Sequence, residues 1–378
     1  MKETVIVRYG EISLKSEPVR EKFEKILINN IHSSLEGIPH KIIQERGRIF
    51  VETESSKKVA LKLSNIPGIV STSPAKKTKS EMEKIKSLAR AMVKEKFSDG
   101  GTFAINARRA GNHSFSSKDI EEEVGSEILK IKPTLEVDLD SPEQVLNIEA
   151  RQKNSYVFID KIPAIGGLPV GCQGKTVNPY IENQINNTIS SILLLKRGSP
   201  VYPLIFNPSE ELEKPKLEKP IELLKEVNSN IKLATVDVAE VEDKISKISP
   251  DDYEELVREK IFLKISEKVA NKIGAEALIS GKKPQKSGLK QIRLLESGID
   301  FPVLHPLAGL TEGLGKETKE KVESELGKET LDNLGRFDGK RVKQEKLNRL
   351  MEQVRDDISY KSIYKSLNIQ KPGEIEWI

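Results

Sequence analysis

The hydrophobic pattern of this chain changes at one glycine- and proline-rich stretch, residues 163–175 (PAIGGLPVGCQGK). The stretch has neither a helical nor a strand period, and glycine and proline are the strongest interrupters of regular structure. At 378 residues the chain is also longer than a single core usually supports. We therefore expect separate folding regions on the two sides of a linker.

The region before the linker opens with a short α+β pattern. An alternating strand covers residues 4–9, helical spacing follows Pro18, and two short strands flank Gly47. A helix at 57–63 and an apolar stretch at Ile69 complete the pattern. Strand, helix, strand, strand, helix, strand is the order of a ferredoxin-like domain.

A second α+β pattern follows. It has a helix at 80–97, a strand at 102–106, and a helix at 116–131 whose serines offer N-caps to an acidic first turn. Three further strands are predicted, at residues 135–139, 145–150 and 156–159.

After the linker, apolar strand-like runs alternate with helices at 184–197 and 253–273, which predicts a parallel α/β layer. The strand-like runs are residues 200–206, 231–236 and 277–279. The predicted fold class is thus α/β and α+β multidomain, with domains at 1–75, 76–162 and 176–330, the linker at 163–175, and a basic C-terminal tail at 331–378.

Composition excludes several classes of protein. One cysteine, Cys172, rules out an internal disulfide framework, and with four histidines we expect no metal site. No apolar run approaches the roughly 20 residues of a membrane span, and the N-terminus lacks a signal-peptide pattern, so we predict a cytoplasmic protein without a membrane partner. The net charge of +4 is modest and does not by itself indicate a nucleic-acid partner, and with only 5% aromatic residues we expect no base-stacking platform of the kind that binds single strands.

Three segments resemble the tRNA 4-thiouridine synthetase family: VRYGEISLKS, NARRAGNHSFSSKDIEEEVGSEI and GGLPVGCQGK, at residues 7–16, 106–128 and 166–175. Residues 258–281 and 301–310 are also similar, and the resemblance ends near Leu326, before the basic tail. It implies a ferredoxin-like domain, a THUMP RNA-binding domain and a Rossmann-like, adenine nucleotide alpha hydrolase-like domain. It also implies that the partner is the acceptor end of tRNA.

The candidate RNA-binding residues lie around the second segment. Arg108 and Arg109 at a strand exit are expected to bridge adjacent phosphates, and the N-terminus of the next helix to offer free backbone amides to the same anion. The remaining candidates are His113, Ser116, Ser117, Lys118, Lys15, Arg20 and Arg151. On residue types alone, solvated loop charges beside a helix cap are the better explanation; the resemblance favours RNA binding.

The nucleotide loop of the family is missing. The family has SGGxDS before a helix that ends in Lys-Arg-Gly; here the ending is kept at 196–198, and the loop position reads ENQINN at 182–187. Without glycines, successive backbone amides cannot turn onto phosphate oxygens, Glu182 adds a negative charge, and Pro179 removes an amide from the preceding strand. A similar-looking ESGIDFPV at 296–303 follows a helix instead of a strand, so we do not assign it as a phosphate site.

No catalytic residue is predicted. The family's transferases use a cysteine in the pyrophosphatase domain, whereas Cys172 lies in the linker. We therefore expect a tRNA-binding module without a cofactor, which presents tRNA to a separate tRNA-modifying enzyme, pairs with a catalytic paralogue, or acts as a tRNA chaperone. A homodimer is left open as well. The alternatives are an active ATP-dependent tRNA sulfurtransferase with an atypical site, and an assembly role in which RNA is incidental.

Overall fold

The structure is a computed structural model that describes residues 3–181, 184–207, 214–249, 251–283, 288–309, 320, 324, 344–357 and 365–371. The chain divides into two compact units. The first contains residues 1–15 and 35–166, and the second contains residues 16–34 and 167–378. Within the described ranges, no helix is both long and apolar enough to cross a bilayer.

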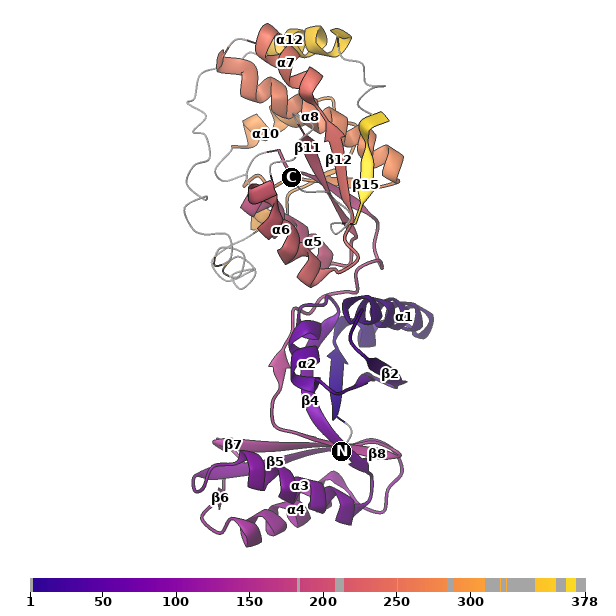
Figure 1. Cartoon of the computed structure of the whole chain (residues 1–378), viewed down its shortest axis with the longest axis vertical. Helices are drawn as coiled ribbons and strands as arrows, with labels where there is room; N and C mark the ends of the chain where they lie inside the picture. Colours follow the sequence, from indigo (N-terminus) through magenta and orange to yellow (C-terminus); the bar gives the residue numbers. More distant parts are fainter. Residues whose placement is uncertain are drawn as a thin grey trace. The chain divides into compact units, whose positions relative to one another are not determined.

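The sheet of the first unit has nine strands, in the order β2-β3-β1-β4-β8-β7-β5-β6 with β9 (Ile162–Pro163) paired to β4. The predicted ferredoxin-like order is confirmed along the chain (Figure 1). Its elements are β1 (Glu3–Tyr9), η1 (Glu11–Leu14), α1 (Glu17–Ser34), β2 (His40–Glu45), β3 (Arg48–Thr53), α2 (Ser56–Ser64) and β4 (Ile69–Lys79).

The second part of this unit also follows the predicted order. Its elements are α3 (Met82–Lys96), β5 (Thr102–Arg109), α4 (Ser117–Ile131), β6 (Glu136–Val137), β7 (Gln144–Ala150) and β8 (Asn154–Phe158). Apolar residues of α3 and α4, among them Ile85, Leu88 and Val124, pack on alternate residues of β5 and β7 such as Ile105 and Ile148. This alternation places every second strand residue on the opposite side of the sheet.

That opposite side, here called the strand face, has a small buried core of its own. The core contains only strand residues: Ile6, Phe50, Ala75, Tyr156 and Phe158. The rings of Phe50 and Tyr156 stack with their centroids 4.2 Å apart. β4 joins the two parts of the sheet, because it pairs with β1 on one side and β8 on the other.

The second unit has a six-stranded sheet in the order β14-β13-β10-β11-β12-β15. Every pair is parallel except β12 with β15. The strands are β10 (Thr176–Pro179), β11 (Val201–Asn207), β12 (Leu233–Asp237), β13 (Ala277–Ile279), β14 (Val303–Leu304) and β15 (Asn368–Gln370). The chain begins this sheet in its middle, at β10, and winds outward in both directions, as doubly wound folds do.

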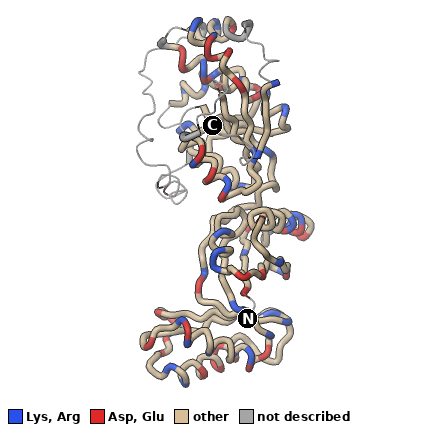
Figure 2. Tube along the Cα trace, viewed as in Figure 1, with Lys and Arg blue, Asp and Glu red and all other residues tan. Residues whose placement is uncertain are grey.

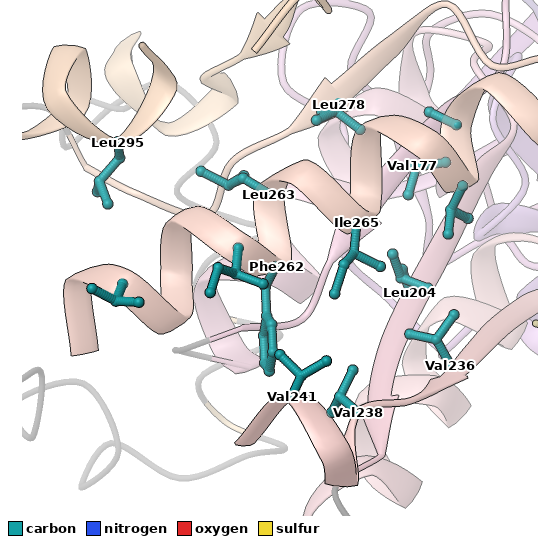
Figure 3. Packing of buried hydrophobic residues seen from close by; sticks show 14 of the residues in the cluster. Val177, Leu204, Val236, Val238, Val241, Phe262, Leu263, Ile265, Leu278 and Leu295 are labelled. Atoms are coloured by element: carbon teal, nitrogen blue, oxygen red, sulfur yellow. The ribbon is translucent and has the colours of Figure 1, made fainter. Parts of the chain in front are cut away.

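The core of the second unit forms between this sheet and α8 (Asp251–Ile273). Val177, Leu204 and Val236 of three neighbouring strands face Phe262 and Ile265 of the helix (Figure 3). The other helices are α5 (Gln184–Lys196), α6 (Lys214–Val227), α7 (Ala239–Ile248), α10 (Leu289–Glu296), the short η2 (Pro306–Gly309) and α12 (Gln344–Asp357).

Two described pieces of the C-terminal region take part in this fold. Leu347 and Leu350 of α12 are buried in the same core, and β15 pairs with β12. At the other end of the chain, α1 belongs to this unit, where the Asn30 side-chain amide donates a 3.0 Å hydrogen bond to the Val170 carbonyl. The remainder of the predicted basic tail lies outside the described residues.

Candidate nucleic-acid interface and nucleotide-binding position

Arg108 and Arg109 end β5 and lie on opposite faces of the sheet. Both are exposed, and in the described ranges neither has a carboxylate within 4.0 Å. Arg108 pairs in register with Glu149 of β7 and belongs to the strand face, whereas Arg109 pairs with Ala150. Because consecutive strand residues point in opposite directions, the two guanidiniums leave β5 on opposite faces. That this pair bridges adjacent phosphates stays a prediction.

The turn after β5 is fixed by hydrogen bonds. The Asn112 amide donates to the Gln152 side-chain oxygen at 2.8 Å, and the Gln152 side-chain amide donates back to the Asn112 carbonyl at 3.3 Å. Gly111 has a φ of +112°, which side chains rarely adopt, and its carbonyl accepts a 2.9 Å bond from Arg109 Nη1. This loop therefore presents Arg109 in one defined arrangement.

The N-terminus of α4 is closed by a capping box, as its serines predicted. Ser116 Oγ accepts the Asp119 amide at 3.1 Å, and the Ser116 amide donates to Asp119 Oδ2 at 2.7 Å. The hydrogen bonds from Ser116 lower the pKa of the Asp119 carboxyl. Ser116 therefore does not offer a free amide to an anion, because its amide is bound to a carboxylate that shares the same helix end.

The other candidates of the loop and first segment have separate surroundings. His113 stacks on Phe115 with ring centroids 4.9 Å apart, and Lys118 Nζ lies 3.6 Å from Glu122. Lys15 is exposed at the end of η1. Arg20 belongs to the second unit and lies 3.3 Å from Glu17 and 4.0 Å from Glu24, so its charge is largely offset within α1. Ser117 starts α4 and is half-buried.

Arg151, a candidate RNA-binding residue, is turned inward. Its Nη2 lies 2.6 Å from Oε1 of Glu149, whose side chain is only 6% exposed. Arg48 Nε approaches the same oxygen at 3.0 Å, and Arg8 Nη2 lies 3.7 Å from the other oxygen. A buried carboxylate requires such partners because its desolvation is costly. Sequence reasoning missed Arg8 and Arg48, although the period of β1 separates Arg8 from the apolar Val5 and Val7.

The arginines around Glu149 outnumber it. Burial lowers the pKa of Arg8 to about 10; Glu149 opposes this shift, and the nearby Arg48, Arg108 and Arg151 add to it. The guanidinium of Arg8 lies 4.9 Å from the centre of the Phe158 ring, which offers it a favourable π face. Elsewhere in this unit, both signs of charge occur along α3 and α4 (Figure 2).

In the second unit, the position of the family's nucleotide loop lies at the carboxyl end of β10. This strand lies between β11 and β13, where a doubly wound sheet reverses its strand order and where such sheets bind ligands. Residues 184–187 form the first turn of α5, and residues 182–183, including Glu182, lie outside the described residues. Pro179 ends the strand, and the Tyr180 amide still donates to the Leu204 carbonyl at 2.9 Å.

Neutral polar side chains fill this position. The Asn178 side-chain amide donates to the Asn187 carbonyl at 2.8 Å and to Ser191 Oγ at 2.7 Å. The Tyr180 hydroxyl lies 3.4 Å from Thr188 Oγ1, and burial raises the pKa of Tyr180 to about 12. All of these residues are buried. A side chain at Gly281, just after β13, would collide with the Asn187 side chain, so that side chain occupies the gap between β13 and α5.

These residues do not fit a nucleoside triphosphate. A pyrophosphate loop needs successive backbone amides in a glycine-permitted turn, usually supplemented by cations. Here Gln184–Asn187 form the first turn of a helix and include no glycine, and the side chains of Asn178, Asn187 and Ser191 are neutral, with the Asn178 amide donating to the other two residues. The segment ESGIDFPV at 296–303, which resembles the family's loop in sequence, runs from the end of α10 to the start of β14. It therefore follows a helix, as predicted, and does not follow a strand as a phosphate-binding loop would. Cys172 is half-buried.

Fold and site together define a THUMP-containing protein with a doubly wound parallel-sheet unit. Three family models match successive parts of the chain: the ThiI ferredoxin-like domain at 4–73, the THUMP domain at 79–160, and the thiamine biosynthesis protein ThiI at 171–331.

Relatives match nearly the whole chain. A probable tRNA sulfurtransferase of Methanocaldococcus jannaschii is 31% identical over 86% of this chain and 88% of its own length. A probable tRNA sulfurtransferase of Thermococcus kodakarensis is 32% identical over 82% of this chain and 85% of its own length. The chain belongs to the ThiI-like tRNA sulfurtransferase family. Its structure is similar to that of a 4-thiouridine synthetase in complex with RNA and ATP, with a TM-score of 0.80 and 26% identity over 98% of this chain and 99% of that one.

Proposed function

We propose that this protein binds tRNA through its first unit and takes part in tRNA modification in the cytoplasm without catalysing the reaction itself. The RNA half of the proposal is supported by the THUMP domain and by the similarity to a synthetase solved with RNA. The residues of the first unit proposed to contact RNA are Lys15, Arg108, Arg109, His113, Ser117 and Lys118, with Ser116 and Arg151 holding their neighbours in place. Arg20 of α1 is a separate proposed contact in the second unit. The arrangement of the first-unit residues favours contact with phosphates, which positions an RNA without reading its bases.

The observation that carries the non-catalytic half is the neutral polar cluster at the carboxyl end of β10. The Asn178 side-chain amide donates to the Asn187 carbonyl and to Ser191 Oγ of α5, so a neutral polar side chain lies where an ATP-pyrophosphatase has a glycine-rich phosphate-binding turn. The Asn178 donors are engaged and gain little by exchanging partners, and Oδ1, the atom of this side chain without a partner among the described residues, is an acceptor that cannot donate to a phosphate. We therefore propose that no cofactor is used, and that sulfur transfer to the bound tRNA is carried out by a partner.

An ATP titration tests this half directly. Calorimetry with ATP and magnesium, in the presence and absence of tRNA, should give no measurable heat of nucleotide binding. Filter binding with unmodified tRNA under the same conditions should give a dissociation constant that weakens steeply with added salt. Micromolar ATP affinity would overturn the non-catalytic half, and failure to retain tRNA would overturn the RNA half.

One observation favours the rival function, an active ATP-dependent tRNA sulfurtransferase: the similarity to a 4-thiouridine synthetase holding ATP extends over 98% of the chain. Pyrophosphate release separates the two functions. The rival predicts release that requires tRNA, whereas our proposal predicts none until a catalytic paralogue or another modifying enzyme is added. Sedimentation with and without tRNA then distinguishes a homodimer from a complex with such a partner.

A further inference from the structure

The strand face carries an excess of arginine around Glu149. Arg8 comes from β1, Arg48 from β3 and Arg108 from β5, and Arg151 directly follows β7. We call these four residues the arginine cluster. The carboxylate within 4.0 Å of three of them is that of Glu149.

Nearby acids do not balance the cluster. Glu45 and Glu52 both lie close enough to Tyr156 to help raise its pKa, although burial is the larger cause. Glu52, however, forms a 2.7 Å ion pair with Lys77. Glu45 has no ion pair with any described residue. The strand face therefore keeps a surplus of positive charge near Glu149.

Two members of the cluster have unused donors. In the described ranges, Arg48 donates one hydrogen bond, from Nη1 to the Gly47 carbonyl at 2.7 Å, while its buried Nε contacts Glu149 without hydrogen-bond geometry. Arg108 is exposed and makes neither a hydrogen bond nor an ion pair with a described residue. A guanidinium has five N–H donors in a fixed plane, so both residues can donate hydrogen bonds to a further anion.

The other two members act as supports. Arg8 donates to Ser73 Oγ at 3.0 Å, and Arg151 donates to Glu149 and to the Arg46 carbonyl at 3.4 Å. Their side chains are only 10% and 12% exposed. With the cations held this closely, bringing in one more anion costs little ordering entropy and relieves repulsion among them.

We propose that the arginine cluster is a binding site for a phosphate of the RNA backbone. Arg48 and Arg108 contact the phosphate, and Glu149 positions the guanidiniums while offsetting part of their repulsion. The inference rests on the proposed tRNA binding and deepens it, since it assigns one phosphate to the strand face and includes two residues, Arg8 and Arg48, outside the set proposed above.

Filter binding of unmodified tRNA at several salt concentrations tests the site. Arg108→Gln and Arg48→Gln should each weaken binding about threefold to tenfold and reduce the salt slope by about one. The matched control is Lys94→Gln, an exposed residue of α3 that removes the same charge from the helix side of the sheet; it should change the dissociation constant less than twofold. The double variant should lose less than the product of the single losses, because both residues serve one phosphate.

The Glu149→Gln variant tests whether the Glu149 carboxylate positions the guanidiniums or only neutralises part of their charge. If the carboxylate only offsets charge, its removal strengthens RNA binding; positioning requires weaker binding despite the added positive charge. The exposed Arg108 variants keep the test decisive if a Glu149 variant fails to fold. Additive losses, or a loss in Lys94→Gln equal to that in Arg108→Gln, would overturn the site. Wild-type protein that does not retain tRNA would instead overturn the proposed function.

Discussion

Two buried polar clusters in this protein are built from opposite kinds of side chain. Around Glu149, the strand face of the first unit gathers formal charges, with guanidiniums in excess. At the carboxyl end of β10, the second unit gathers neutral amides and hydroxyls, among which the Asn178 side-chain amide donates two hydrogen bonds. Positive charge is kept in the unit expected to hold a polyanion, while none of the described groups at the β10 end offers it to a nucleotide.

The comparison also concerns energetics. The desolvation cost of a buried charge is offset only while the charge stays paired. Removing one partner therefore leaves the other charges buried without an opposite charge. A neutral cluster loses less when a member is removed, because each group contributes a smaller desolvation cost. The two clusters should therefore respond to substitution with different magnitudes.

The largest effect is expected for Glu149→Ala. Its removal leaves Arg8, Arg48 and Arg151 in a buried region without their common carboxylate, which should lower the free energy of unfolding by about 3–5 kcal/mol. Urea unfolding measures the change. Glu122→Ala is the control, because that carboxylate is exposed and lies 3.6 Å from Lys118; it should cost under about 1 kcal/mol. Equal losses for the two variants would contradict the importance of the buried charges.

Asn178→Ala should have a smaller effect on the second unit. It removes two donated hydrogen bonds and leaves the Asn187 carbonyl and the Ser191 hydroxyl without that partner. The expected loss is about 1–3 kcal/mol, seen in urea unfolding of the full chain. Added ATP should not restore the loss. Stabilisation of this variant by millimolar ATP would mean that the position still accepts a nucleotide.

Ser116→Ala removes the helix cap of α4 and should cost about 1 kcal/mol. Thermal unfolding monitored by circular dichroism is sufficient to detect it. Ser116→Asp keeps an acceptor at the cap position and should recover most of the loss. An alanine variant as stable as the wild type would show that the first turn of α4 does not depend on this bond.

The smallest effect is a pH dependence at the same helix end. The pKa of Asp119 is lowered by its bonds from Ser116, so its ionised form stabilises the fold. This stability is fully present above the unfolded pKa of about 3.9 and is lost as pH falls through the lower folded value. Melting temperatures of the wild type and Asp119→Asn should therefore differ at neutral pH and converge in acid. A difference in melting temperature that stays constant from neutral to acidic pH would mean that Asp119 stabilises the fold through packing and not through its charge.

Local pattern was sufficient to predict most elements of the first unit. The alternation in residues 4–9, the turn at Gly47 and the serines before α4 each determine structure through neighbours in sequence. In the second unit, α6 was missed because Pro220 interrupts its pattern. β15 was missed because a three-residue strand leaves no period to detect.

The cluster around Glu149 could not be predicted in the same way. Arg8, Arg48 and Arg151 are separated by many residues in the sequence and meet only after β1, β3 and β7 have taken their places in one sheet. Sequence assigned Arg151 to the surface because an isolated arginine usually lies there. The side of the sheet that Arg108 faces likewise depends on the register of β5 against β7.

The long strand β4 has a practical consequence for dissecting this protein. A cut between residues 75 and 76 would pass through a strand that hydrogen-bonds to β1 on one side and to β8 on the other. Each fragment would then expose an edge strand with unpaired backbone N–H and C=O groups, and such edges promote aggregation. The two parts of the first unit's sheet should therefore be expressed and mutated together, without a break in β4.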